Sequence, residues 1–306
     1  MVLARLKTGA QIVRAPFFTA VIVPTLVGAA LARQEGALHA GYLAVTLLGI
    51  VCVNAGLNMS NDYFDHLSGN DTNNPHLTPF SGGSRVIQDG VLSPRLVLAG
   101  SIAFYMAGVA IGLYLAWARG WALLWIGLLG VFFAFFHNAP PFKLYYLAPG
   151  VGELAAGIGC GPLVVLGSYY VQTQRLGVEA LWASIPMGLL VAAILYINEF
   201  PDDAADRAAG KKTLVVTLGR RRAVWGYAVL VVATYLAIVL GVGVRVLPYA
   251  LLLALLPLPL AYWAIRGAFR DCDDVQELIP TNALTIQLHL VTGLLMCVGY
   301  VLARLL

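Results

Sequence analysis

The sequence predicts an all-α membrane protein, and three observations lead to this fold class. Of the 306 residues, 60% are hydrophobic and only 11% are charged. The apolar runs are about twenty residues long, which is the length that an α-helix needs to cross a bilayer. These runs are rich in Leu, Val, Ala and Gly, and they predict helices rather than barrel strands, because a helix satisfies its own backbone hydrogen bonds.

Nine candidate spans follow one another along the chain, with no soluble domain or low-complexity linker between them. They cover about residues 16 to 33, 41 to 59, 96 to 117, 120 to 136, 151 to 171, 180 to 200, 223 to 243, 247 to 265 and 284 to 303. We therefore expect residues 1–306 to form one polytopic transmembrane domain.

The distribution of Lys and Arg predicts which side of the membrane each loop faces. If the loops alternate between the two sides, fourteen basic residues fall on the side of the N-terminus and five on the other. Arg5, Lys7, Arg85 and Lys143 belong to the larger group. Cytoplasmic loops carry the excess of Lys and Arg, so we place the N-terminus and both polar clusters described below in the cytoplasm. We expect the membrane to be that of a bacterial or archaeal cell.

The first polar cluster runs from Asn58 to Asp71 (NMSNDYFDHLSGND) and begins at the end of the second apolar run. If the helix continues through this stretch, positions 58, 61 or 62, and 65 share one of its faces. Carboxylate and amide oxygens grouped in this way suit Mg²⁺ better than zinc.

A second polar cluster runs from Asn198 to Thr213 (NEFPDDAADRAAGKKT), at the end of the sixth apolar run. Within it, Asn198, Asp202 and Asp206 are spaced by four. Four candidate spans separate the two clusters, and an even number of crossings returns the chain to the same side of the bilayer. The topology therefore permits one shared, metal-binding central cavity that opens to the cytoplasm.

The pairing of these motifs resembles the UbiA superfamily of intramembrane prenyltransferases, and the resemblance covers nearly the whole chain. The family pattern is roughly NDxxDxxxD in the first motif and DxxxD in the second, within nine helices. The closest likeness is to the branch that prenylates 1,4-dihydroxy-2-naphthoate on the way to menaquinone. Three stretches carry it: NxxNDYxDxxxGxD at Asn58 to Asp71, SGGSR at Ser81 to Arg85, and GKxTLxVxLG at Gly210 to Gly219.

Two positions depart from the family pattern. The third aspartate of NDxxDxxxD falls on Gly69, and the sequence leaves open whether Asp71, two residues later, replaces it. In the second motif, Pro201 directly precedes Asp202, where the menaquinone branch commonly has a different tripeptide.

The resemblance implies a Mg²⁺-dependent enzyme that transfers a polyprenyl group from its diphosphate to a ring carbon of an aromatic acceptor. With 1,4-dihydroxy-2-naphthoate, it implies attack at the carboxylated carbon and loss of CO₂. Alternative acceptors within the family are 4-hydroxybenzoate, a chlorin, haem or a glycerol phosphate lipid, and a terpene cyclase is a further alternative. We expect membrane lipid around the protein, an apolar tunnel for the prenyl tail, and no nucleic-acid partner.

A membrane transporter is the alternative function outside the enzymes, since acidic residues inside a membrane also mark ion pathways. A transporter predicts acids through the depth of the bilayer and on both faces. Here the acids gather on one side, which favours the enzyme.

Departure of a diphosphate requires that its developing charge be neutralised, by metal ions and by basic side chains. We expect the catalytic acids to be Asp62, Asp65, Asp202 and Asp206. The predicted metal ligands are Asn61, Asp65, Asp202 and Asp206. The predicted contacts of the diphosphate or the acceptor are Asn58, Arg85, Lys143, Asn198, Lys211 and Lys212. The four basic residues in this set could instead be ordinary positive-inside residues.

Two further titratable residues lie near the predicted membrane boundary. Glu153 is expensive to bury, so a role as a base or an acceptor-binding group is one hypothesis. His137 ends the fourth span, and we favour loop packing over catalysis for it.

Overall fold

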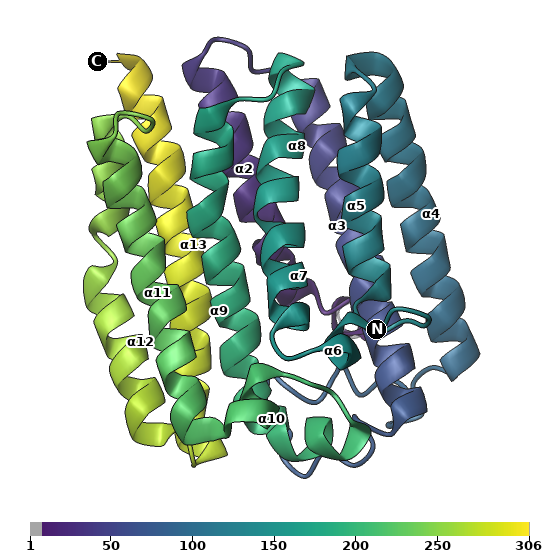
Figure 1. The fold of residues 1–306 in the computed structure, drawn as a ribbon. Helices are drawn as coiled ribbons and strands as arrows, with labels where there is room; N and C mark the ends of the chain where they lie inside the picture. The colour runs from purple at the N-terminus through teal and green to yellow at the C-terminus, as the bar shows by residue number, and fades with distance from the viewer. Residues whose placement is uncertain (1–7, 306) are drawn as a thin grey trace.

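The computed structural model describes residues 8–305, which form a bundle of long, roughly parallel helices (Figure 1). Within this range, eight helical segments are long and apolar enough to cross a bilayer. Ala122–Phe136 is a shorter apolar helix, and it corresponds to the predicted span at residues 120 to 136. The all-α prediction is confirmed, and the chain is an integral multi-pass membrane protein. Arg5 and Lys7 lie outside the described residues.

The helices follow one another without strands in the described part of the chain, apart from an isolated β-bridge between Thr78 and Ser81. In order they are η1 (Ala15–Phe18), α2 (Thr19–Gln34), α3 (Ala40–Ser68), α4 (Pro94–Arg119), α5 (Ala122–Phe136), α6 (Leu144–Leu147), α7 (Val151–Cys160), α8 (Pro162–Thr173), α9 (Val178–Ala209), α10 (Leu214–Leu218), α11 (Arg220–Gly243), η2 (Tyr249–Leu255), α12 (Leu258–Asp271) and α13 (Val275–Leu305).

Helices α3 and α9 run past the ends predicted for their spans, at residues 59 and 200. They continue to Ser68 and Ala209, and each is followed by a glycine with positive φ, 77° at Gly69 and 80° at Gly210. Glycine closes a helix in this way because it adopts the left-handed conformation at little cost. Both acidic motifs are therefore helical, and Gly69, which departs from the family pattern, has a structural role as the cap of α3.

Pro201 lies inside α9 and does not end it. A proline within a helix leaves the carbonyl four residues earlier without its N–H donor, and here that carbonyl belongs to Ile197. Asn282 Nδ2 of α13 donates to Ile197 O at 3.1 Å and to Asn198 Oδ1 at 2.7 Å. Asn282 therefore supplies the missing donor and ties α13 to the acidic end of α9.

Two predicted spans are divided. The span predicted at residues 151 to 171 breaks into α7 and α8 at Gly161, after which Pro162 begins the new helix. A side chain at Gly161 would collide with Gly188 of α9, so this helix contact requires glycine. The span predicted at residues 247 to 265 consists of η2 and α12, joined at Pro257.

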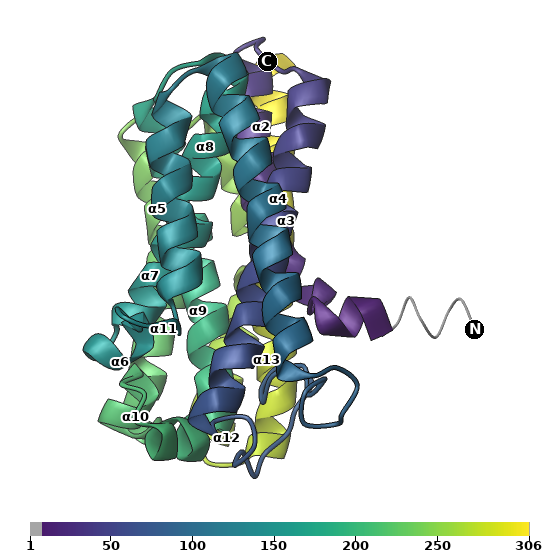
Figure 2. The same ribbon diagram turned by 90° about the vertical axis from the view of Figure 1, so that its right-hand side faces the viewer.

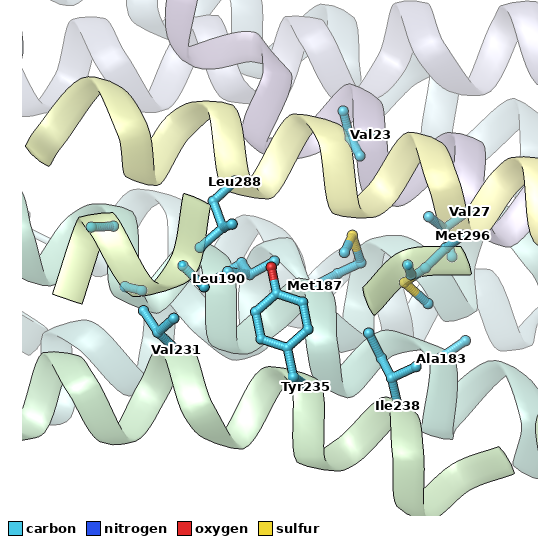
Figure 3. Close-up of a cluster of buried hydrophobic side chains, with 14 of the residues drawn as sticks. Val23, Val27, Ala183, Met187, Leu190, Val231, Tyr235, Ile238, Leu288 and Met296 are labelled. Carbon is cyan, nitrogen blue, oxygen red and sulfur yellow. The ribbon is translucent and has the colours of Figure 1, made fainter. Parts of the chain in front are cut away.

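The largest buried apolar cluster lies among α2, α9, α11 and α13, with contributions from α8, η2 and α12. Figure 3 shows part of it, where Tyr235 of α11 lies among Met187 and Leu190 of α9 and Leu288 of α13. Helices α3, α4 and α5 contribute only to two smaller clusters. The packed core therefore lies on one side of the bundle.

The polar segments gather at one end of the bundle. The loop after α3 and the short helices α6 and α10 lie together at the lower end in Figures 1 and 2. The acidic ends of α3 and α9 point to this same end, and this position brings the two motifs together.

Candidate active site

A cavity of about 230 Å³ lies between α3 and α9, with further walls from η1, α2, α5, α7 and the loop after α3. Its polar lining comes from Arg14, Asn54, Asn58, Asn61, Asp65, Asn70, Asp71, His137, Asn138, Tyr145, Asn198, Glu199, Asp202, Asp206 and Lys211. The remainder of the lining is mostly apolar, with residues such as Ile50, Leu57 and Phe133. Both acidic motifs therefore face one cavity.

Lys211 joins the two motifs. Its Nζ lies 3.0 Å from Asp65 Oδ1 of α3 and 3.3 Å from Asp206 Oδ1 of α9. The lysine side chain is buried, and its Nζ also lies 5.2 Å from the centre of the Tyr145 ring. The acidic ends of two helices that are remote in sequence thus share one cation.

Asparagines orient the carboxylates of the cavity. Asn70 Nδ2 donates to Asp206 Oδ1 at 2.8 Å, and Asn74 Nδ2 donates to Asp202 Oδ1 at 2.6 Å. Asn138 Nδ2, which follows α5, donates to Asp65 Oδ1 at 3.2 Å. The loop after α3 therefore crosses to α9 and fixes its acids. Asn70 and Asn74 could not be singled out from the sequence, because the stretch GNDTNNP has the composition of an ordinary polar loop.

Asp62 contacts Ser84 and Arg14 rather than the cavity. It is buried, it accepts hydrogen bonds from the Ser84 backbone N–H and hydroxyl, and it lies 3.8 Å from Arg14 Nη1. It does not line the cavity, whereas Arg14 does. Its contacts hold the SGGSR loop against α3. Its predicted catalytic role is not tested by this geometry.

The two glycines of SGGSR have positive φ, 79° at Gly82 and 72° at Gly83, and both line the cavity. A side chain at Gly83 would collide with the carboxyl group of Asp71, so the loop can lie this close only with glycine. Asp71 lines the same cavity, and its buried Oδ2 has no hydrogen-bond partner among the described residues.

The predicted basic residues are not all at the cavity. Lys211 lines it, while Arg85, Lys143 and Lys212 do not. Arg85 Nη1 donates to the Asp71 carbonyl at 2.8 Å, and Lys212 Nζ donates to the Leu147 carbonyl at 3.3 Å. Lys143 is exposed, with its Nζ 5.3 Å from the centre of the Tyr146 ring. The predicted ligand contacts of these three residues remain predictions.

Burial and neighbouring charges alter the titration of the groups at the rim. Burial and the nearby Asp65 and Asp62 carboxylates raise the pKa of Asp71 to about 8. Burial alone would lower the pKa of Lys211, but the Asp206 and Asp65 carboxylates hold it well above its ordinary value. The cavity lining therefore has fewer basic side chains than carboxyl groups.

His137 packs against Tyr145, with ring centres 4.3 Å apart. Burial, assisted by the Lys211 charge, lowers the pKa of His137 to about 3, so its ring is neutral near pH 7. This agrees with a packing role.

The donor set of the cavity fits a magnesium ion. The predicted ligands Asn61, Asp65, Asp202 and Asp206 all line it, and Asn61 Oδ1 is buried with no hydrogen-bond partner among residues 8–305. In that range, no three His, Cys, Asp or Glu side chains form a ready metal centre. Mg²⁺ is usually held by one or two carboxylates together with substrate phosphates rather than by a protein cage, so this arrangement suits it.

A second cavity, of about 220 Å³, continues from the first between α3, α4, α5 and α8. The two cavities share Ile50, Val53, Gly130, Gly159 and Val164. The lining of the second is almost entirely aliphatic side chains and glycine. A polar, acidic chamber thus leads into an apolar one.

Such an arrangement fits a ligand that has a charged head and an apolar tail. The sequence profile of the UbiA prenyltransferase family matches residues 21–279, and the chain belongs to this family. It is therefore a prenyl-transferring enzyme, as the motifs predicted.

Two relatives show the likeness in sequence. The chain is 32% identical to the 2-carboxy-1,4-naphthoquinone phytyltransferase of Synechocystis, over 94% of this chain and 91% of that protein. It is 27% identical to the 1,4-dihydroxy-2-naphthoate octaprenyltransferase of Bacillus subtilis, over 96% of this chain and 92% of that protein.

Two solved structures share the fold. A UbiA homolog from Archaeoglobus fulgidus bound to GPP and Mg²⁺ has a TM-score of 0.66 and 17% identity, covering 94% of this chain and 99% of that one. The apo structure of a UbiA homolog from Aeropyrum pernix K1 has a TM-score of 0.68 and 19% identity, covering 94% and 98%.

Proposed function

We propose that this protein transfers a polyprenyl group from a prenyl diphosphate to a dihydroxynaphthoate-type acceptor in a Mg²⁺-dependent reaction. The observation that carries the proposal is the pair of joined cavities, one acidic and one apolar. An allylic diphosphate has the same two parts, and its reactive carbon lies between them. The naphthoate acceptor rests on the relatives from Synechocystis and Bacillus subtilis, whose names state that class of substrate.

In this proposal the acidic chamber holds the diphosphate head. Asn61, Asp65, Asp202 and Asp206 would hold Mg²⁺, which as a Lewis acid would neutralise charge on the departing diphosphate. Lys211 already lies between Asp65 and Asp206. Its ammonium group would contact diphosphate oxygens directly and hold the leaving group in place.

Asn58 and Asn198 complete the polar wall in this proposal. Asn58 Nδ2 is held by the Val13 carbonyl at 2.9 Å, and Asn198 Oδ1 accepts from Asn282. Both side chains are therefore fixed before a ligand arrives. Fixed polar groups contribute more to binding and to rate than mobile ones, because they need not reorganise.

The apolar chamber would take the prenyl tail. Gly112, Gly127 and Gly130 line it, and a Cβ atom at any of them would meet nothing within 4 Å. Glycine destabilises a helix by about 1 kcal/mol relative to alanine, and at these positions no close helix contact accounts for it. Their effect is to leave volume between α4 and α5.

We further propose that residues 1–306 act as one domain in the cell membrane, with the N-terminus and the active site in the cytoplasm. The support is the excess of Lys and Arg on that side. A water-soluble diphosphate head also has to be reached from an aqueous compartment, and the polar end of the bundle provides that access.

The test is to measure prenyl transfer by the purified chain with Mg²⁺, a prenyl diphosphate and 1,4-dihydroxy-2-naphthoate. We expect Asp65→Asn and Asp202→Asn each to reduce the rate by about 10³-fold while the protein stays folded. Asp203→Asn is the matched control, because Asp203 pairs with Arg207 and Arg220 and does not line the cavity. Near-normal rates for Asp65→Asn or Asp202→Asn would refute the assignment.

A further inference from the structure

Glu199 is a buried carboxyl group that faces the acidic chamber. The sequence motifs did not predict a role for it. Its side chain lines the cavity, and the residue is only 3% exposed. Neither of its oxygens has a hydrogen-bond donor among the described residues. A buried carboxyl group without a donor is costly, so a group in this position usually has a function.

The height of Glu199 along α9 places it where the reaction occurs. It precedes Asp202 by three residues, so the two side chains share a face about one helical turn apart. On its other side, beyond the adjacent Asn198, the next lining residues of α9 are Leu195 and Ile194, which are apolar. Glu199 therefore lies at the junction of the diphosphate end and the tail end, where the carbon joining head and tail would lie.

Glu153 of α7 is the main charged neighbour of Glu199. Glu153 Oε1 accepts from the Leu214 backbone N–H at 2.7 Å, which fixes its position, and Glu153 does not line the cavity. Glu153 is thus a fixed carboxyl group that can accept a hydrogen bond from Glu199 once Glu199 carries a proton.

The other groups near Glu199 are poor bases. Burial, together with the charges of Glu199 and Glu153, raises the pKa of Tyr145 well above its ordinary value, so this phenol keeps its proton. The lowered pKa of His137 makes its ring a weak base. Asp206 is held by Asn70 and Lys211.

We propose that Glu199, backed by Glu153, accepts the hydroxyl proton of the aromatic acceptor as the new carbon–carbon bond forms. This inference rests on the proposed prenyl transfer. The hydroxyl O–H bond breaks, its proton goes to Glu199, and its electron pair forms a C=O bond. The ring carbon then bonds to the first carbon of the prenyl group, whose C–O bond breaks with both electrons leaving on the diphosphate.

The same proton completes the cycle when the attacked carbon bears a carboxylate. Loss of CO₂ returns the electron pair of the broken C–C bond to the ring, and the former hydroxyl oxygen takes the proton back from Glu199. No oxidant, reductant or external base is consumed. The glutamate pair is restored for the next turnover.

The experiment compares Glu199→Gln with the wild-type chain, using Mg²⁺, a prenyl diphosphate and 1,4-dihydroxy-2-naphthoate. We expect kcat for transfer to fall about 100-fold with the donor KM unchanged. Release of diphosphate without acceptor should continue at the wild-type rate. A wild-type kcat in the variant would overturn the inference, as would parallel losses of transfer and acceptor-free release.

Glu179→Gln is the matched control. Glu179 lies on the same helix, and its Oε1 is also buried without a donor among residues 8–305, but it does not line the cavity. We expect wild-type kinetics for it. A loss in this control equal to that of Glu199→Gln would mean that removal of any buried acid from α9 is harmful.

A second measurement keeps the inference testable if Glu199→Gln is poorly stable. Acceptors with electron-withdrawing substituents have more acidic hydroxyl groups and need a base less. The ratio of wild-type to variant kcat, for Glu199→Gln or the shorter Glu199→Asp, should therefore shrink with these acceptors. A kcat ratio that does not change with the acidity of the acceptor hydroxyl group would contradict the inference.

These outcomes separate the inference from the proposed function. If the wild-type chain makes no prenylated product with Mg²⁺ and the naphthoate, the proposed function fails. If the wild-type chain makes it and Glu199→Gln does so equally fast, only the role of Glu199 fails.

Discussion

The two sides of the bundle differ in how tightly they are packed. In α9, 72% of the most apolar 18-residue window is buried, against 22% in α3 and in α4. Gly188 of α9 is packed against α7 and α8, and a Cβ atom there would lie 2.8 Å from the Gly157 carbonyl. Gly127 of α5 would meet nothing within 4 Å. Gly188 thus serves close helix contact and Gly127 leaves open volume, while Gly108 of α4, which packs against Val53 and Gly49, shows that α3 and α4 also approach each other closely.

This difference suggests a division of labour within the proposed enzyme. The packed side, with α9 at its centre, holds Asp202, Asp206 and Glu199 in fixed positions, which suits groups that act on the reacting atoms. The open side borders both cavities and leaves room for a ligand. Substitutions of the same kind on the two sides should therefore have different effects.

The largest expected effect is that of Gly188→Val. The added side chain would collide with the Gly157 carbonyl and with Pro162, so we expect a loss of more than about 3 kcal/mol and little folded protein. Gly127→Val, on the open side, should yield folded protein. Size-exclusion chromatography and thermal melting in detergent measure both. Equal yields of the two variants would contradict the difference in packing between the two sides of the bundle.

Phe200→Ala should destabilise the protein by about 3 kcal/mol, because Phe200 is fully buried in the core of α9. The matched variant is Leu129→Ala in α5, whose side chain is 49% exposed on the open side. It should cost well under half as much. The midpoints of thermal unfolding compare the two, and a larger loss at position 129 would contradict the packing difference.

Gly130→Val tests the open side as a binding volume. Gly130 lines both cavities, and a side chain there enters open space. We expect a folded enzyme that uses the longest prenyl diphosphates about tenfold less well while keeping its rate with dimethylallyl diphosphate. The kcat/KM values for donors of increasing length measure this. A uniform loss at all lengths would argue against a role in accommodating the tail.

The smallest effect is expected far from either cavity. Arg175 forms an ion pair with Glu35 at the end of the bundle opposite the acidic motifs, and its side chain is 63% exposed. Exposed ion pairs contribute little to stability because water screens them. Arg175→Gln should therefore show no measurable change in Tm or in transfer rate, and a clear loss of activity would reveal coupling across the bundle.

Much of the fold could be predicted from the sequence. Hydropathy located the spans, and the spacing of Asn58, Asp65, Asp202 and Asp206 identified two helical faces that line one cavity. Hydropathy could not predict the ends of α3 and α9, because Gly69 and Gly210 determine them. The two helices continue past the apolar runs to these glycines, so the acidic motifs are helical as well.

The contacts within the site were harder to predict. Whether a basic residue faces the cavity depends on loop geometry, so Lys211 and Lys212, adjacent in sequence, have different surroundings. Glu153 stood out as an acid near the membrane boundary, yet Glu199 is the one that faces the cavity. Glu199 was overlooked because it lies outside the spacing of four that links Asn198, Asp202 and Asp206.

The contact between Asn282 and Ile197 O has a consequence for the order of assembly. During synthesis α9 enters the membrane well before α13, and until α13 docks, the carbonyl opposite Pro201 has no partner from Asn282. The acidic end of α9 thus reaches its final shape only when the last helix is in place. A truncated chain that lacks α13 should therefore be inactive even when its other helices have inserted into the membrane.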